Sequence, residues 1–202
     1  KEDRRQRQMC IRDSNKAVLD LSDRLEEERK TLDPADPQAI QSCAETAQTL
    51  RAALDAAKTE GLAKDVDRQA SHVLAAACST LLAQTDLSSQ TFDQTLETLE
   101  ALALHPMPEV RDTTEADFAK HPQWGTPSPR VRAAQAIAEA FNRPGVWLRL
   151  STVAERLLLA DPHPAVRMQL ASRLNGLWNE ARPDMWRPVS YTHLTLPTIL
   201  LV

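Results

Sequence analysis

The chain has 202 residues, with 24 Lys and Arg against 28 Asp and Glu, and its net charge of −4 excludes a nucleic-acid binder that depends on a strongly basic surface. Apolar residues make up 42% and charged residues 26%, as in an ordinary soluble globular chain, and no apolar run approaches the roughly 18 residues that a membrane helix needs. Three cysteines are too few for a disulfide framework and favour a reducing compartment, the cytoplasm, while only 4 glycines argue against a β-sandwich or barrel.

The two ends of the chain are related at the codon level. Residues 1–14 and 188–201 can both be encoded by one DNA segment that is read in opposite directions. Their strings RRQRQMCIRDS and VSYTHLTLPTI also resemble the translated adapter of transposase-based sequencing libraries. We therefore expect residues 1–14 to be an artefactual, disordered segment and residues 188–202 to be an artefactual tail, with residues 15–187 a fragment of a longer protein.

The segment 15–88 is expected to be helical and carries no repeat motif. Its apolar residues recur at helical spacing in three stretches, which cover residues 15–32, 38–58 and 64–84. Asp36 can cap the second helix, with Pro37 at its first position, and Gly61 suits its C-terminal cap. The pattern leaves two interpretations open, degenerate repeats or a small separate bundle.

The segment 89–187 has a different character, because prolines become frequent and a motif, P-x-P-x-V-R, recurs in it. Its three copies lie at residues 106–111, 127–132 and 162–167. Pro-x-Pro ends one helix and begins the next, because the second proline suits the first position of a helix, and Ser128 can cap the second copy. The expected helices run over residues 89–104, 108–120, 129–141, 146–160 and 164–178.

The helix expected after the first copy is the weakest of these. Asp112, Thr113, Thr114 and Glu115 dilute its apolar face, and the first copy lies too close to the second for a standard helix pair. We therefore expect an irregular repeat or an insertion between these two copies.

The motif copies resemble HEAT repeats, in which the second helix of a repeat begins with a D-x-x-P-x-V-R stretch. Residues 161–167 match this stretch closely, residues 127–141 match it without the leading Asp, and residues 106–111 match only in the motif itself. The resemblance covers residues 89–178 and implies an all-α fold, in which antiparallel helix pairs stack as a HEAT-like α-solenoid fragment.

The resemblance also implies structural roles for the motif residues, with the valines in the core and the Asp and Arg in polar contacts between neighbouring repeats. These residues are Pro108, Val110, Arg111, Pro129, Val131, Arg132, Asp161, Pro164, Val166 and Arg167. On this basis Asp161 is expected to pair with Arg132 or Arg167.

Residues with reactive side chains form no catalytic or metal-binding pattern. The histidines His72, His105, His121 and His163 have no metal-ligand spacing and are expected to be structural or turn residues. Cys43 and Cys78 lie on apolar helical faces and are expected to be small core residues. The sequence contains no Gly-rich phosphate loop, so we expect no catalytic site, no cofactor and no metal.

Trp124 and Arg130 are the candidate partner contacts. Trp124 lies in an expected loop and is either an exposed anchor or a cover for the core, and Arg130 with Arg132 forms a locally basic segment that is either structural or phosphate-binding.

The sequence predicts a non-catalytic helical-repeat interaction module, a scaffold or sensing arm of a larger protein. Its partner is expected to be another protein or another domain of the parent chain, bound along residues 131–141 and 166–178, with no membrane. One alternative is a regulatory region of a larger enzyme, such as an ATPase or a lyase-type HEAT protein. The other is a HEAT-like nucleic-acid surface, which net charge disfavours unless six arginines share one face. They are Arg130, Arg132, Arg143, Arg149, Arg156 and Arg167.

Overall fold

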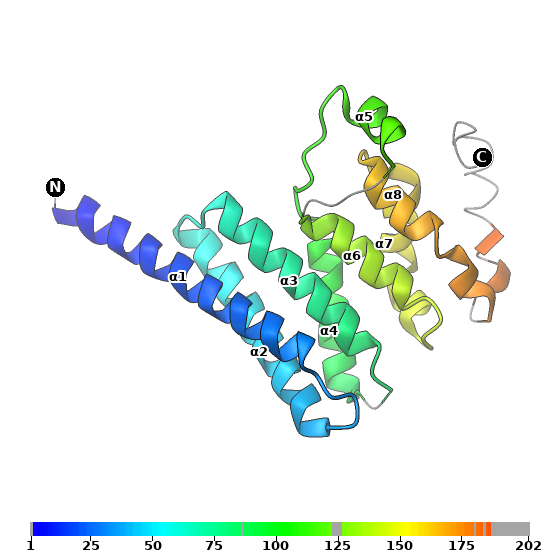
Figure 1. The fold of residues 1–202 in the computed structure, drawn as a ribbon, viewed down its shortest axis with the longest axis horizontal. Helices are drawn as coiled ribbons and strands as arrows, with labels where there is room; N and C mark the ends of the chain where they lie inside the picture. The colour runs from blue at the N-terminus through cyan, green and yellow to red at the C-terminus, as the bar shows by residue number, and fades with distance from the viewer. Residues whose placement is uncertain (1, 86, 123–126, 180, 184, 187–202) are drawn as a thin grey trace.

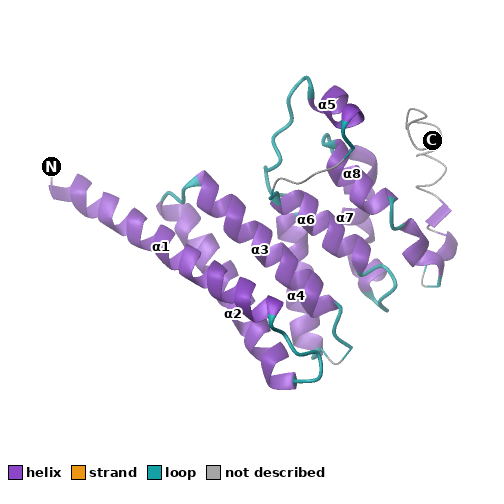
Figure 2. Cartoon of the chain, viewed as in Figure 1, coloured by secondary structure: helices purple, strands orange, loops and turns teal. Residues whose placement is uncertain are grey.

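The computed structural model describes residues 2–85, 87–122, 127–179, 181–183 and 185–186, and this part of the chain is all-helical (Figure 1, Figure 2). It contains eight α-helices and one 3₁₀ helix, and the described residues form no β-strand. The helices are α1 Glu2–Lys30, α2 Pro37–Glu60, α3 Lys64–Leu82, α4 Ser89–Leu102, α5 Thr114–Lys120, α6 Pro129–Glu139, α7 Val146–Ala160, α8 Pro164–Ala171 and η1 Leu174–Trp178. The all-α class predicted from the sequence is therefore confirmed.

The helices form two layers. In the layer nearer the viewer of Figure 1, α1, α3, α6 and α8 lie side by side in that order, and each packs against the next. The second layer holds α2, α4 and α7, and each of them packs against the two front-layer helices that precede and follow it in the chain. The short helix α5 lies outside both layers and touches α8.

A single apolar core joins the segments 15–88 and 89–187, because α3 packs against both α4 and α6. Small side chains allow this close approach in the middle of the molecule. On α3, Ala75 and Ala77 are fully buried, as are Ala133 and Ala136 on α6. Alanine loses no side-chain entropy in a helix and leaves room for a neighbouring backbone.

The first helix begins much earlier than the sequence analysis predicted. The structure places residues 2–14 in the first part of α1. No Gly or Pro occurs before Pro34, so no helix-breaking residue separates residues 2–14 from the helix that the apolar residues around Val18 form. The middle of α1 is joined to the end of α2, because the Ser14 hydroxyl donates to Glu60 and the Asn15 Oδ1 accepts the N–H of Ala63 at 3.1 Å. The tail 188–202 lies outside the described residues.

The ends of α2 follow the predicted local chemistry. The Asp36 carboxylate accepts the backbone N–H of Gln38 at 2.9 Å, and Pro37 occupies the first position of the helix. Gly61 ends α2 in the left-handed conformation, with φ +114°, and its N–H binds the carbonyl of Ala57. Both caps are therefore confirmed.

The second and third motif copies begin α6 and α8, with Pro129 and Pro164 at the first turn as predicted. The expected cap from Ser128 is wrong, because its side chain makes no capping hydrogen bond. Instead the Ser128 N–H lies 3.2 Å from the Nδ1 atom of His72 on α3, which accepts it.

The helix expected directly after the first motif copy does not form, because α5 begins only at Thr114. Val110 was expected in the core and is 46% exposed, and Arg111 is also exposed. The polar residues that follow offer no apolar face for a helix to bury, so the chain leaves the layers as a loop. Within the described residues, no helix combines the length and the apolar character that crossing a membrane requires.

Candidate functional site

The three motif copies meet at the side chain of Arg130, which follows the proline at the start of α6. Its Nη1 donates at 2.6 Å to the carbonyl of His105, just before the first copy, and its Nη2 donates at 3.1 Å to the carbonyl of Pro108, within that copy. Its Nε lies 2.9 Å from the Oδ2 of Asp161, just before the third copy. Arg130 is only 8% exposed and holds three loops together, the structural one of the two roles that the sequence left open for it.

Asp161 thus pairs with Arg130, which corrects the expected pairing with the side chain of Arg132 or Arg167. Arg167 instead donates to the backbone carbonyl of Asp161 at 2.7 Å and pairs with Glu115 of α5. Arg132 lies 3.6 Å from Glu139 on its own helix. The motif valines that begin helices, Val131 and Val166, are buried.

The residue before each Pro-x-Pro has the same role in the first and third copies. The Nδ1 of His105 accepts the N–H of Met107 at 3.0 Å, and the Oδ1 of Asp161 accepts the N–H of His163 at 2.9 Å. Each side chain closes a turn onto the amide two residues later. His105 therefore stands where the third copy has its leading Asp, a correspondence that the sequence analysis missed.

Three of the histidines accept backbone N–H groups at helix starts and turns. His163 accepts the N–H of Ala165 at the start of α8, and the other ring nitrogen of His105 lies 3.2 Å from Asp67, so it is the donor. Burial is the largest cause that lowers the pKa values of His72 and His163. The neutral imidazoles of His72 and His163 each accept a backbone N–H at Nδ1 and so stabilise the starts of α6 and α8. The side chain of His121 is exposed.

The two core cysteines are poor nucleophiles. Burial raises the pKa of the Cys43 thiol to about 11 and that of Cys78 to about 12. Because the thiolate is the reactive form, both stay protonated and inert at neutral pH. Among the residues that the structure describes, no group of His, Cys, Asp and Glu is arranged to hold a metal ion.

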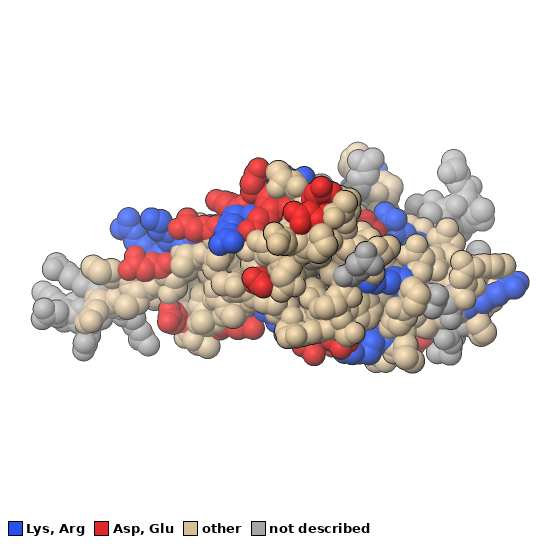
Figure 3. All heavy atoms as spheres, turned by 90° about the horizontal axis from the view of Figure 1, so that it is seen from below, with Lys and Arg blue, Asp and Glu red and all other residues tan. Residues whose placement is uncertain are grey.

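The arginines that a nucleic-acid surface would need are held by contacts within the fold. Arg149 pairs with Asp93 at 2.7 Å, and Arg156 reaches the carbonyl of Ala103 at 3.5 Å. Arg143 donates to two carbonyls at the end of α3. On the side of the molecule seen in Figure 3, acidic and basic side chains are interspersed and form no continuous basic field.

Glu139 connects three front-layer elements on the outer side of that layer. It accepts the hydroxyl of Ser79 on α3 and the amide of Gln135 on α6, and it lies 3.4 Å from Arg173, which follows α8. Nearby charges extend this polar strip to α1, because Glu26 and Arg29 act electrostatically on both His72 and Arg132. We call this strip the front face. Its residues are Glu26, Arg29, His72, Ser79, Arg132, Gln135, Glu139 and Arg173.

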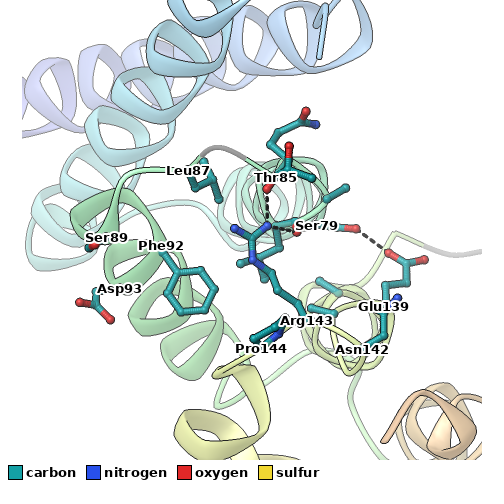
Figure 4. A pocket seen from close by; sticks show the side chains of 15 residues that line it. Ser79, Thr85, Leu87, Ser89, Phe92, Asp93, Glu139, Asn142, Arg143 and Pro144 are labelled. Carbon is teal, nitrogen blue, oxygen red and sulfur yellow. Dashed lines mark hydrogen bonds between the residues drawn. The ribbon is translucent and has the colours of Figure 1, made fainter. Parts of the chain in front are cut away.

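A pocket of about 860 Å³ opens at one end of the front face (Figure 4). Its walls come from the α3–α4 turn, the first turn of α4 and the α6–α7 turn. The side chain of Arg143 crosses it, with Nη1 donating to the carbonyls of Leu82, at 2.5 Å, and of Gln84. The same guanidinium lies over the ring of Phe92, 5.1 Å from its centroid. Arg143 therefore ties the α6–α7 turn to the end of α3, as Arg130 ties the other end of α6 to the loop after α4.

The carboxylates that line this pocket have arginine partners outside it. Asp93 pairs with Arg149, and Glu139 is contacted by Arg132 and Arg173. Burial lowers the pKa of Arg143, but a guanidinium keeps its charge at neutral pH. The sequence analysis did not single out this pocket, and its only local signal is the turn sequence Arg143-Pro144-Gly145.

A second, smaller pocket of about 370 Å³ lies between α2 and α4. Asp67 is at its floor, 3.5 Å from Lys58, and it accepts hydrogen bonds from Ser71 and His105. Burial alone would raise the pKa of Asp67, but the hydrogen bond from His105 and the charge of Lys58 outweigh burial and lower it. Asp67 therefore links Lys58 near the end of α2, Ser71 on its own helix and His105 after α4.

The tryptophans divide between core and surface. Trp147 is buried and packs edge-on against Phe141, with ring centroids 5.7 Å apart. Trp178 is 46% exposed, and the guanidinium of Arg182 lies 4.0 Å from its centroid. The candidate contact Trp124 lies outside the described residues. No protein-family model, curated protein or solved structure gives a significant match to this chain.

Proposed function

We propose that this chain is a HEAT-like α-solenoid segment that acts as a protein-interaction module. The observation that carries the proposal is the order of packing, in which front-layer helices contact their neighbours in chain order and each second-layer helix fits between two of them. Linear arrays of this kind present a long surface and carry no chemistry of their own. The contacts of Arg130 with the first and third motif copies provide the link between repeats.

The partner, in this proposal, is another protein or another domain of the same parent chain, and it binds along the front face. Four front-face residues lie within the segments 131–141 and 166–178 that the sequence suggested as the surface. They are Arg132, Gln135 and Glu139 on α6 and Arg173 after α8. Apart from the exposed Arg173, its side chains are half-buried, so part of their conformational entropy is already lost before a partner binds. The free thiols of Cys43 and Cys78 favour the cytoplasm as its compartment.

Native-state hydrogen exchange on the full chain tests the array. In a linear array, stability is a sum over repeats and their interfaces, so the ends open separately from the centre. We expect amides of α3 and α6 to be the most protected, with α1 and α2 opening at a lower free energy. A single opening free energy and a single denaturant dependence for all helices would contradict the solenoid.

Peptide selection tests the binding face. A random-peptide display library is selected on the full chain, and the enriched peptides are then measured against two matched variants. Gln135→Arg changes the centre of the front face, whereas Gln48→Arg makes the same change on α2 in the second layer. We expect Gln135→Arg alone to weaken binding. Peptides that are insensitive to both variants, or weakened equally by both, would contradict the assignment of the face.

A further inference from the structure

The smaller pocket, between α2 and α4, combines a buried apolar lining with an exposed leucine at its mouth. Leu54 of α2, Leu74 of α3 and Leu102 of α4 line it and are buried. Leu104, just after α4, also lines it, and this side chain is 65% exposed. These lining residues belong to the ranges 51–74 and 98–106, which the structure describes without a gap. A buried apolar pocket inside a polar rim is typical of the centre of a protein interface.

Three charged side chains of α2 form one side of the rim, and their signs alternate. Arg51, Asp55 and Lys58 are four and three residues apart, so they share one face of the helix. The Nε of Arg51 lies 4.0 Å from the Oδ2 of Asp55, and the Nζ of Lys58 lies 3.5 Å from Asp67. Ion pairs of such exposed side chains contribute little to stability, so these charges can also attract the charges of a partner.

Hydrogen bonds at both ends of the pocket fix the positions of its walls. The Nη1 of Arg51 donates to the hydroxyl of Thr98 at 2.8 Å and so joins α2 to α4. At the other end, one ring nitrogen of His105 lies 3.2 Å from Asp67 of α3, and the other accepts the N–H of Met107. A pocket whose walls are already ordered loses little conformational entropy when a side chain enters it.

We propose that this pocket binds an amphipathic helix of a partner protein, with a leucine side chain inside the pocket and alternating charges along α2. It lies apart from the front face and is a second contact surface beyond the proposed function. An apolar helix face laid into a groove is a common mode of recognition, read as anchors at i, i+3, i+4 and i+7. The order on α2 is positive, negative, positive, so the complementary helix carries acidic, basic and acidic residues at the same spacing, as in Glu-x-x-Leu-Lys-x-x-Glu.

The pocket favours a helix over a free small molecule or a partner of one charge sign. Its volume of about 370 Å³ is near the lower end of the range for pockets that enclose a whole ligand. A ligand confined to it would leave Leu104 in water, whereas a helix across the mouth covers this side chain. Among the described lining residues, two cations balance two carboxylates, so a partner with both signs fits best.

Three peptides test the proposal by NMR on the full chain, each cross-linked on its outer face so that it is helical in solution. The first is acetyl-Ala-Glu-Ala-Ala-Leu-Lys-Ala-Ala-Glu-Ala-Ala amide, the second has Ala in place of Leu, and the third exchanges every Glu and Lys. We expect the first to shift the amides of Leu74, Thr98 and Leu104, the second to bind about tenfold more weakly, and the third to bind several-fold more weakly. No binding by the first peptide, equal binding of the first two, or shifts confined to other surfaces would overturn the proposal.

Two matched variants assign the leucine to this pocket. Ala101→Phe fills the mouth from α4, whereas Ala52→Phe makes the same change at an exposed position of α2 outside the lining residues. Both alanines are exposed helix residues, so both variants should remain folded. We expect Ala101→Phe alone to abolish the shifts of the first peptide, and equal loss in both variants would overturn the assignment.

A charge exchange tests the contact with α2. Asp55 is exposed, and we expect Asp55→Lys to weaken the first peptide several-fold and to restore binding of a version with Glu in place of its Lys. An unchanged preference between these two peptides would overturn the proposed charge match. Gln135→Arg on the front face should leave the binding of the first peptide unchanged, and loss of binding in that variant would place the helix on the front face and overturn the proposal. If Gln135→Arg weakens the library peptides while the first peptide does not bind, only the helix inference fails.

Discussion

Replacing Arg130 by Met tests whether the three motif copies are held together at one buried ion pair. The side chains of Arg130 and Asp161 are 10% and 5% exposed, and Nε and Oδ2 lie 2.9 Å apart. Methionine has a similar length but leaves Asp161 as a buried charge without its cation, and the carbonyls of His105 and Pro108 lose their donor. Breaking a buried pair by removing one partner costs about 3–5 kcal/mol, a large part of the total stability of a domain.

The second substitution, Asp161→Asn, distinguishes the ion pair from simple loss of packing. Asparagine can still accept the N–H of His163, as Asp161 does at 2.9 Å, but it carries no charge. In the Arg130→Met background it removes the uncompensated charge, so we expect the double variant to be more stable than the sum of the two single losses by about 1–3 kcal/mol.

Urea denaturation followed by circular dichroism measures all four chains of this cycle. Arg111→Met is the matched control, because Arg111 occupies the last motif position of the first copy and is exposed. It should change the free energy of unfolding by less than about 0.5 kcal/mol. The reasoning is refuted if Arg130→Met costs no more than this control, or if the two losses simply add in the double variant.

Three further predictions follow from the histidines and cysteines. His163→Ala removes the side-chain cap of α8 and should cost about 1 kcal/mol in urea denaturation, whereas His163→Asn, which can also cap, should cost clearly less; equal losses would argue against the cap. Burial lowers the pKa values of His72 and His163 from 6.5, so these rings take up protons more readily in the unfolded chain, and the free energy of unfolding should fall as the pH drops below about 6.5. Urea titrations between pH 7.5 and 5 check this, and a flat profile would contradict it. With a thiol reagent at neutral pH, exposed Cys10 should react fast and buried Cys43 and Cys78 should react only after unfolding, and rapid labelling of all three in the native chain would contradict their burial.

Local signals in the sequence were sufficient to predict most helix boundaries. Asp36 with Pro37, Gly61, Pro129 and Pro164 act on the backbone within one turn, and the structure begins or ends helices at each of them. The first motif copy shows the limit of such signals. It has the same two prolines, but a helix also needs an apolar face to bury, and Val110 is left 46% exposed.

The candidate site could be predicted only in part, because its contacts join loops that are distant in the sequence. Arg130 binds carbonyls 25 and 22 residues before it and a carboxylate 31 residues after it. Nothing in its local sequence distinguishes a buried arginine from an exposed one, so the sequence left a structural role and a partner contact both open for it. The pocket at Arg143 could not be predicted either, since it exists only where the turn after α3 meets the turn after α6.

The sequence by itself determined which residues form helices and which face of each helix is apolar, because both depend on spacing and capping within a few residues. The tertiary structure decided which arginines hold the fold together. That outcome depends on which carbonyls and carboxylates the packing of α3 against α6 and of α6 against α8 brings within reach. Hydrogen bonds and buried ion pairs act over a few ångströms, so they are set by the final arrangement of the helices and not by the order of residues along any one of them.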